Sequence, residues 1–264
     1  MHDNYETLLI DSPEPQLLRV VLNRPDAANA LNTQMGCDLL DVFSSIVLDA
    51  GDTRCIVLTG VGGKAFCAGG DLKERNGMTD DAWRSQHAIF EQAFYAIMDC
   101  PVPVIAAVNG AAYGGGCEMA LACDFAYAVP GARFALTEVT LGIMPGCGGT
   151  QNLPRAAGLR RAKEVLLTGT PFTAQDALDW GVINRICEPA ALMPSAIDTA
   201  RRISANAPLA VRQAKRSMNA GIETDLKSGL AFEVEAYNRL VPTEDRAEGM
   251  RSFNEKRKPK FSGR

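Results

Sequence analysis

Apolar and polar residues follow two different periods in the first fifty positions of the chain. The runs Tyr5 to Ile10 and Leu17 to Leu22 predict two strands, joined through Ser-Pro-Glu-Pro as a hairpin. From Asn32 onward, apolar residues return every three or four positions, the spacing of one helix face. The apolar residues of this face are Met35, Leu39, Val42, Phe43 and Ile46. The chain therefore opens with a hairpin followed by a helix.

Strands and helices then alternate. Arg54 to Thr59, with the apolar residues Cys-Ile-Val-Leu at its centre, predicts a buried strand, and a glycine-rich loop follows it. Thr79, with two aspartates after it, predicts the start of a long helix that ends near Asp99. The segment 101–110 is a second strand. This alternation indicates an α/β core with parallel strand pairing, in which ligand loops lie at the carboxyl ends of strands.

The character of the chain changes to helices beyond about residue 190. Four helices are predicted without an intervening strand: 192–205, 209–218, 226–240 and 244–256. We therefore divide the chain into a core of residues 1–190 and a helical region of residues 191–264. The helical region packs either on the core or on neighbouring subunits.

Composition and charge narrow the function classes. Of 264 residues, 47% are hydrophobic and 22% are charged, which is ordinary globular composition. The net charge of −4 disfavours nucleic acid and anionic membranes as partners. The longest uncharged run, Cys100 to Cys117, contains two prolines and four glycines, so it predicts no membrane span. Because no signal-peptide pattern opens the chain, we expect a cytoplasmic protein.

Cysteine and histidine offer little catalytic chemistry. The eight cysteines form no Cys-x-x-Cys pair, which predicts buried, reduced thiols, and Cys67 and Cys117 are expected to be packing residues. The histidines are His2 and His87, so the His-Glu-x-x-His pattern of zinc sites is absent and no metal is expected. We expect His87 on a helix, exposed or half-buried.

Two isolated carboxylates are the candidate acid and base. Glu118 is the only charge between residues 100 and 123, and Glu138 is the only charge between residues 134 and 154. Removing a carboxyl group from water raises its pKa toward the range that suits proton transfer near neutral pH. The alternative is that each carboxylate caps a backbone group or pairs with a distant arginine.

Glycines precede Glu118 directly, at positions 114–116, and the sequence after them predicts a helix. The backbone N–H groups at a helix N-terminus lack partners and carry positive potential, which suits an oxyanion. Glu118 would then lie one turn inside, on roughly the same face as Gly115. Close packing of this helix against a strand would also require glycine, and the sequence leaves both readings open.

The earlier glycine-rich loop resembles a phosphate-binding loop only superficially. Leu58 stands where the first glycine belongs, and Ala65 follows Lys64 where Ser or Thr should stand. Small residues at 68–70 would nevertheless let a ligand approach backbone N–H groups closely. We expect Asp71 to cap the turn that follows, although a catalytic role stays open.

Three motifs, in order, carry a family resemblance. AFCAGGDL, NGAAYGGGCEMALACD and FALTEVTLGIMPGCGGTQNLPRAAG resemble the enoyl-CoA hydratase/isomerase (crotonase) family, and the match extends over nearly the whole chain. The segment DLKER and the ending PTEDRAEGMRSFNEKRKPKFSG look closest to the methylglutaconyl-CoA hydratase branch. The resemblance implies an α/β fold, a crotonase-like spiral of ββα turns, with C-terminal helices that assemble trimers, often paired into hexamers.

The resemblance also implies roles for individual residues. The backbone N–H groups of Gly70 and Gly115 would hold the thioester oxygen, and Glu118 and Glu138 would hold the water. Coenzyme A would run along the loops 24–28 and 65–72, and no separate cofactor is expected because it enters as part of the substrate. The implied acyl-CoA-binding residues are Arg24, Ala28, Ala65, Ala68, Asp71 and Leu72.

The expected reaction is syn hydration of a 2-enoyl-CoA, in which Glu118 activates water and Glu138 protonates the enolate. Isomerisation, decarboxylation and thioester hydrolysis on the same scaffold are the nearest alternatives, and an RNA-associated protein without catalysis is a more distant one. We expect residues 76–94 to decide which acyl group fits.

Overall fold

The computed structural model describes residues 4–264, so His2 lies outside the described residues. The predicted hairpin is confirmed: β1 (Leu8–Asp11) pairs antiparallel with β2 (Leu17–Leu22). Strand β1 starts later than predicted, and Tyr5 instead donates a hydrogen bond from its hydroxyl to Asp41.

Two sheets share the core. The larger sheet has the order β1-β2-β3-β5-β7-β10 and the smaller the order β4-β6-β8-β9. Within the described residues, all pairings are parallel except β1 with β2 and β8 with β9. The strands after the hairpin are β3 (Cys55–Gly60), β4 (Ala65–Cys67), β5 (Val104–Val108), β6 (Ala111–Tyr113), β7 (Phe125–Ala128), β8 (Arg133–Ala135), β9 (Phe172–Thr173) and β10 (Arg185–Ile186).

Each turn of the chain adds one strand to each sheet and then a helix. Strands β3, β5 and β7 are neighbours in the larger sheet, and β4, β6 and β8 are neighbours in the smaller one. This is the ββα spiral that the resemblance implied. The connection from β6 to α4 and the connection after β4 therefore lie at the same edge of the smaller sheet.

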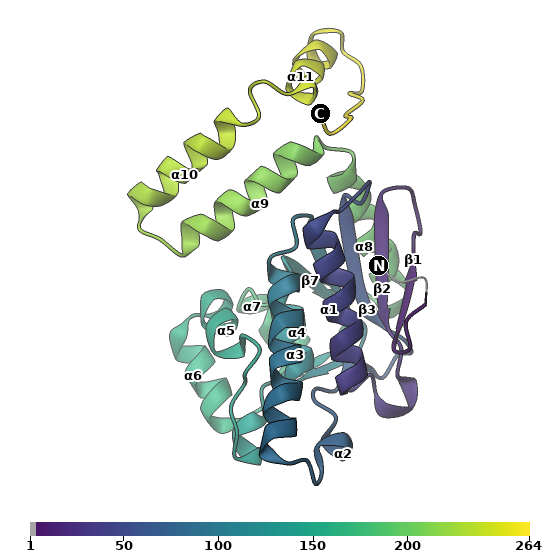
Figure 1. The fold of residues 1–264 in the computed structure, drawn as a ribbon, viewed down its shortest axis with the longest axis vertical. Helices are drawn as coiled ribbons and strands as arrows, with labels where there is room; N and C mark the ends of the chain where they lie inside the picture. Colours follow the sequence, from purple (N-terminus) through teal and green to yellow (C-terminus); the bar gives the residue numbers. More distant parts are fainter. Residues whose placement is uncertain (1–3) are drawn as a thin grey trace.

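Helices cover the sheets as the apolar pattern predicted. Asn32 caps α1 (Thr33–Leu48), and Thr79 caps α3 (Asp80–Met98), which packs along α1 (Figure 1). The other helices of this part are the 3₁₀ helix η1 (Pro25–Ala27), α2 (Leu72–Arg75), α4 (Gly115–Ala122), the 3₁₀ helix η2 (Glu138–Leu141), α5 (Gly149–Ala157), α6 (Leu159–Thr168) and α7 (Ala174–Asp179).

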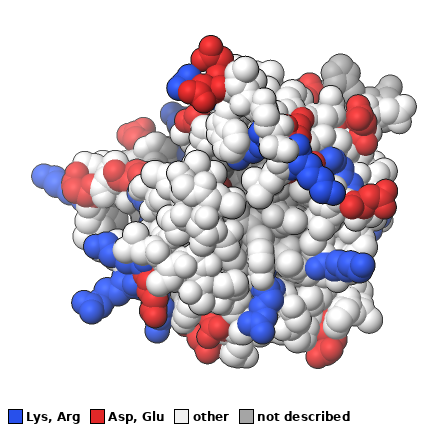
Figure 2. All heavy atoms as spheres, turned by 90° about the horizontal axis from the view of Figure 1, so that it is seen from below, with Lys and Arg blue, Asp and Glu red and all other residues white. Residues whose placement is uncertain are grey.

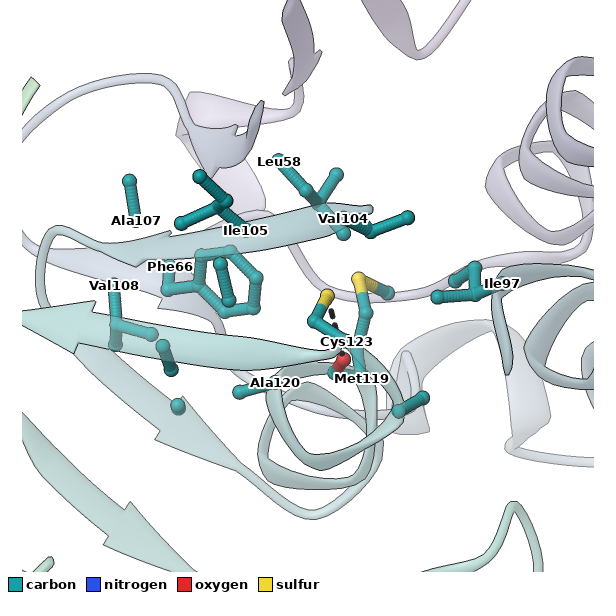
Figure 3. Packing of buried hydrophobic residues seen from close by; sticks show 14 of the residues in the cluster. Leu58, Phe66, Ile97, Val104, Ile105, Ala107, Val108, Met119, Ala120 and Cys123 are labelled. Carbon is teal, nitrogen blue, oxygen red and sulfur yellow. Dashed lines mark hydrogen bonds between the residues drawn. The ribbon is translucent and has the colours of Figure 1, made fainter. Parts of the chain in front are cut away.

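The hydrophobic core fills the space between the sheets and α4. Figure 3 shows Met119 of α4 and Cys123, the residue that follows α4, directed toward Val104 of β5, with the ring of Phe66 between the strands. All four side chains are buried. Because α4 is anchored by this packing, its first turn has a fixed position relative to both sheets.

Four helices end the chain, as predicted. Helix α8 (Pro189–Ser204) lies against the larger sheet, and α9 (Pro208–Ile222) and α10 (Leu226–Asn238) form a pair that extends away from it, before α11 (Glu244–Asn254) (Figure 1). The division of the chain into a core of residues 1–190 and a helical region of residues 191–264 stays a prediction.

An ion pair of the buried Lys215 fixes α9 to the core. The Lys215 ammonium lies 2.7 Å from Asp124 Oδ2 and donates to the Val102 carbonyl at 3.1 Å. Asp124 Oδ2 also accepts the Val104 N–H at 2.7 Å, at the start of β5. Removing Asp124 would leave the buried ammonium group of Lys215 without its counter-charge, which is costly, so the pair holds α9 in one orientation.

The exposed faces of α9 and α10 are unusually apolar. Six large apolar side chains on these two helices are each more than half exposed: Met218, Ile222, Leu226, Leu230, Val234 and Tyr237. Contiguous apolar surface of this kind is typical of an interface with another chain.

The thiols are free, and seven of the eight are buried as predicted. Cys37 is the exception, because it lies on the exposed face of α1, opposite the apolar face that packs on the core. Within residues 4–264 there is no helix with the length and apolarity needed to cross a membrane.

Candidate active site

The structure brings the two predicted catalytic residues and the two predicted oxyanion-hole residues to one cavity. Gly70, Gly115, Glu118 and Glu138 all line a cavity of about 560 Å³. They come from the loop after β4, the first turn of α4 and the 3₁₀ helix η2, three segments that are far apart in the sequence. The spiral is what places them together, because these connections leave neighbouring strands of the smaller sheet.

The two glycine-rich loops lie backbone against backbone. A Cβ atom on Gly116 would stand 2.1 Å from the Cys67 carbonyl oxygen, and one on Gly69 would stand 2.7 Å from the Tyr113 carbonyl oxygen. No side chain fits at either position. Close packing therefore explains these two glycines.

Gly115 is different, because a Cβ atom there would meet nothing closer than Leu31 Cδ2 at 3.7 Å. It is the first residue of α4, so its N–H has no acceptor within the helix. Close packing therefore accounts for Gly116, whereas Gly115 fits the other reading, an N–H group at the start of a helix that is available to an oxyanion.

The N–H of Gly70 points away from Leu31, the residue with which Gly70 forms a bridge. Leu31 forms a parallel bridge with Gly70, in which Leu31 N donates to Gly69 O and Asp71 N donates to Leu31 O, both within 2.9 Å. Because alternate groups of an extended chain point to opposite sides, the Gly70 N–H points away from Leu31. Gly70 and Gly115 thus present on the cavity wall two N–H groups that have no acceptor within residues 4–264.

Glu118 is a buried carboxylate held by backbone donors. Its Oε1 accepts the N–H groups of Cys147 and Gly149, each at 2.8 Å. Gly149 is the first residue of α5, so the carboxylate faces the positive end of that helix. Burial raises the pKa of Glu118 to about 7, against the lowering effect of the two N–H donors. The group can therefore give and take a proton near neutral pH.

Glu138 faces the same cavity from η2. Its Oε2 is enclosed and has no hydrogen-bond partner within residues 4–264, and burial raises the pKa of this carboxyl group. Gly114, at φ +49°, makes room for it, since a Cβ there would stand 2.9 Å from Glu138 Oε1. An enclosed oxygen without a partner favours the protonated acid, which can donate.

The predicted acyl-CoA residues lie in two connected loops. Asp71 caps α2, accepting the N–H groups of Lys73 and Glu74 as predicted, and its Oδ2 lies 2.9 Å from Arg24 Nη2. This ion pair ties loop 24–28, where Ala28 is half-buried, to loop 65–72.

The remaining predicted residues of loop 65–72 differ in whether they reach the cavity. Ala68 and Leu72 are exposed and line the cavity. Ala65 is a buried residue of β4 and does not line the cavity, so its side chain cannot meet a ligand there.

Helix α3 supplies the cavity wall opposite the glycine-rich loops. Trp83, His87 and Phe90 line the cavity, within the range 76–94 that we expected to shape it. His87 is half-buried, as predicted, and its ring packs where a Cβ on Gly146 would otherwise be. The three-to-four-residue spacing of these side chains puts them on one face of α3, a signal that the sequence analysis did not use.

The backbone donors of the loop 146–149 were not predicted, although the Pro-Gly-Cys-Gly-Gly sequence before a helix was visible. No group of three or more His, Cys, Asp or Glu side chains with metal-binding geometry occurs among the residues that the structure describes.

A family model described as enoyl-CoA hydratase/isomerase matches residues 14–264, nearly the whole chain. The chain belongs to this family. It is 41% identical to the short-chain-enoyl-CoA hydratase of Clostridium acetobutylicum, over 93% of this chain and 94% of that one. It is 38% identical to the crotonyl-CoA hydratase of Syntrophomonas wolfei, over 97% of this chain and 98% of that one.

A solved structure agrees in fold along its entire length. The crystal structure of an enoyl-CoA hydratase from Bacillus anthracis covers 98% of this chain and 100% of its own, with 42% identity and a TM-score of 0.96. The predicted crotonase-like α/β fold is therefore confirmed. Membership of the methylglutaconyl-CoA hydratase branch stays a prediction.

The pKa of Glu118 generates a prediction for stability. The pKa rises from an ordinary value of 4.5 to about 7, so the folded protein binds this proton more tightly than the unfolded chain does. The stabilisation is complete below pH 4.5 and is lost as pH rises toward 7, by about 3 kcal/mol. The Glu118→Gln variant keeps an oxygen for the two N–H donors and does not ionise.

We therefore expect the free energy of unfolding of Glu118→Gln, minus that of the natural protein, to increase between pH 4.5 and 7 and to be constant above pH 8. Urea unfolding at a series of pH values measures this difference. A difference that does not change with pH would contradict the assigned burial.

Proposed function

We propose that the protein is an enoyl-CoA hydratase, which adds water in the syn sense to the double bond of a trans-2-enoyl-CoA through an enolate. One observation carries the proposal: two carboxyl groups with raised pKa values line the same cavity as two backbone N–H groups without acceptors. This arrangement combines a proton acceptor, a proton donor and a binding site for a negatively charged oxygen.

The N–H groups of Gly70 and Gly115 would hold the thioester oxygen. Attack of water at C3 moves the electron pair of the double bond toward this oxygen and generates an enolate. Donors fixed in place before the reaction stabilise that charge without reorganising, and they act more strongly in the transition state than on the neutral thioester. The oxyanion hole therefore accelerates the reaction step itself.

The two carboxyl groups would divide the proton transfers. With a pKa of about 7, Glu118 is ionised in a large fraction of molecules at neutral pH, and it takes a proton from water as the hydroxyl adds to C3. Glu138 enters protonated and gives its proton to C2 as the enolate collapses. Transfer of a proton from Glu118 to Glu138 through solvent then restores both groups.

Coenzyme A would follow the loops 24–28 and 65–72. The ion pair of Arg24 with Asp71 supports this path, because it holds the two loops in one arrangement beside Ala68 and Leu72. The proposed reaction transfers only protons and a hydroxyl group. We therefore expect no cofactor, since coenzyme A enters as part of the substrate.

An acyl-CoA partner is favoured over nucleic acid by the charge distribution. Figure 2 shows acidic and basic side chains interspersed around one face, with an uncharged centre and no continuous basic surface. A protein that binds nucleic acid through phosphates needs clustered positive charge, and this chain has a net charge of −4.

We also propose a homo-oligomer, a trimer or a hexamer, assembled through the C-terminal helices. The exposed residues Leu226, Leu230 and Val234 recur every four positions and form an apolar stripe on α10. A second copy of the chain is the partner that would cover it. The seven buried free thiols support a reducing compartment, and we propose the cytoplasm.

The first test follows the loss of the conjugated enoyl-thioester absorbance with crotonyl-CoA. We expect rapid loss with the natural protein and a decrease in kcat of about 10²–10⁴-fold in both Glu118→Gln and Glu138→Gln, because each removes one proton transfer. Glu164→Gln, on the exposed surface of α6, is the matched control and should keep its rate.

Mass spectrometry of the product distinguishes the related reactions. Hydration adds one water to the acyl group, whereas isomerisation leaves the mass unchanged and hydrolysis releases coenzyme A. Absence of a hydrated product with the natural protein and crotonyl-CoA would contradict the proposal for this substrate.

A second test removes one oxyanion donor without removing a side chain. Gly115 is the first residue of α4, a position that accepts proline, and it has room for a Cβ atom. Gly115→Pro deletes the N–H, and we expect kcat to fall about 10²–10³-fold. Gly115→Ala keeps the N–H and should lose far less. Equal rates for the two variants would remove Gly115 from the oxyanion hole.

The oligomer is tested by placing a charge in the apolar stripe. Leu230→Glu buries an unpaired carboxylate if a second copy covers α10, so we expect sedimentation velocity to show a shift toward smaller species. Glu235→Lys, on an exposed position of the same helix away from the stripe, should sediment as the natural protein does. A natural protein that sediments as a monomer would contradict the assembly.

A further inference from the structure

The two N–H groups that hold Glu118 lie on a loop with little stiffness of its own. Residues 145–149 have the sequence Pro-Gly-Cys-Gly-Gly, and glycine gives a chain more conformational freedom than any other residue. The N–H groups of Cys147 and Gly149 nevertheless stay 2.8 Å from Oε1 of Glu118. Contacts from outside the loop therefore have to fix its position.

One such contact comes from His87 on α3. A Cβ atom on Gly146 would stand 2.4 Å from Cε1, 2.7 Å from Nε2 and 3.5 Å from Nδ1 of His87, and apart from the adjoining residues these are the three nearest atoms. The φ of Gly146 lies outside the left-handed region, so the backbone conformation does not require glycine there. The ring of His87 does require it, because the ring occupies the space of a side chain.

This contact reaches the donor through one rigid unit. The peptide plane that joins Gly146 to Cys147 contains both the Cα atom of Gly146 and the N–H of Cys147. The ring of His87 therefore presses on one end of a plane whose N–H donates to Glu118. Helix α3 keeps the ring in place, because the side chain of Phe90, one turn further along, is buried in the core.

We propose that His87 is a positioning residue for the reaction: its ring fixes Gly146 and thereby directs the N–H of Cys147 at Glu118. This inference rests on the proposed function only in the role of Glu118 as the base. The ring meets an α-carbon, which is at most a weak hydrogen-bond donor, so the contact is one of shape. The size of the ring matters, and its charge does not.

The ionisation of Glu118 reports the position of its donors. Burial raises the pKa of Glu118, and the N–H groups of Gly149 and Cys147 lower it. A displaced donor raises this pKa further, whereas water that enters beside the carboxylate lowers it. The direction of a pKa change therefore separates the loss of a donor from simple exposure.

Other titratable groups near this contact are constant in the comparison. The remaining charged or titratable side chains that line the cavity are unchanged in every variant below: Arg75 on α2, Arg84 and Glu91 on α3, Glu138 on η2 and Cys147 in the loop itself. Each measurement is a difference between two proteins that have the same residue at position 87, so the titration of His87 cancels.

The test truncates the ring and measures the ionisation of Glu118 without substrate. The free energy of unfolding of His87→Ala with Glu118→Gln, minus that of His87→Ala alone, is measured by urea unfolding at a series of pH values. A carboxyl group whose pKa is raised by folding destabilises the folded state as it ionises, so this difference increases with pH until Glu118 is fully ionised. We expect the increase to continue about one pH unit higher than with His87 in place, because the donor of Cys147 is displaced.

An exchange of size between the two positions provides the rescue. Gly146→Ala alone places a methyl group against the ring, and we expect it to cause an upward shift of the same kind. When Gly146→Ala is combined with His87→Ala, the new methyl group occupies space that the ring has left. The shift should then be smaller than in either single variant, and shifts that add would overturn the proposal.

Ile89→Ala is the matched control on the same helix. Ile89 is half-buried, and its Cγ2 lies 3.2 Å from the position of a Cβ on Gly36, so it packs toward α1. Its truncation should lower the free energy of unfolding without moving the pH range in which Glu118 ionises. A shift equal to that of His87→Ala would show a general effect of weakening α3 and would overturn the proposal.

Kinetics with crotonyl-CoA give a second measurement. The rise of kcat/KM with pH should move up by about one pH unit in His87→Ala, since more alkaline conditions are needed to ionise the base. The proposal is overturned if the pH range of Glu118 is unchanged or moves down, including the case in which KM alone changes because His87 contacts the substrate. Unfolding needs no turnover, so failure of the hydratase proposal and failure of this one are seen in separate measurements.

Discussion

The site depends on the contact between two loops whose backbones touch. Gly69 and Gly116 allow the loop after β4 and the first turn of α4 to approach until carbonyl oxygens occupy the space of a side chain. That approach brings the N–H of Gly70 and the N–H of Gly115 to one cavity. A larger residue at either contact would separate the loops, and both donors would then be misplaced together. The parallel pairing of β4 with β6 sets the approach, since it brings the two connections to one sheet edge.

The carboxyl groups of Glu118 and Glu138 lie where burial suits proton transfer but lowers the stability of the folded protein. Glu118 is buried at the end of α5, where ionisation is disfavoured by burial and favoured by two backbone donors. The compromise places its pKa near neutrality and makes the folded protein less stable when the group ionises. Glu138 keeps one oxygen without a partner, which is tolerable only while the group is protonated. The two groups can differ in protonation because two backbone N–H groups stabilise the ionised form of Glu118, whereas Oε2 of Glu138 has no partner among the described residues.

Local patterns in the sequence predicted much of the fold and part of the site. The period of apolar residues placed α1 and the C-terminal helices within a few positions, and Asp71 and Thr79 were recognised as caps from their neighbours. The isolation of Glu118 and Glu138 in apolar stretches predicted their burial. What could not be predicted depends on contacts between distant turns of the spiral. The N–H donors of the loop 146–149 are of this kind, because their contact with Glu118 follows from three-dimensional neighbours. The exposure of Cys37 was missed because composition does not tell which face of a helix a small residue occupies.

The donors proposed to hold the enolate belong to the main chain, and this has a consequence for how such proteins diverge. Point mutations replace side chains and leave the peptide N–H in place, proline excepted, so the capacity to stabilise an enolate is shielded from most genetic change. The side chains of Glu118 and Glu138 have no such protection. Drift and selection can therefore exchange the acid, the base or the acyl contact one at a time while the charge-stabilising step persists. Intermediates along such a path keep a partial activity on which selection can act, and new reactions arise from an old scaffold without loss of the step that is hardest to rebuild.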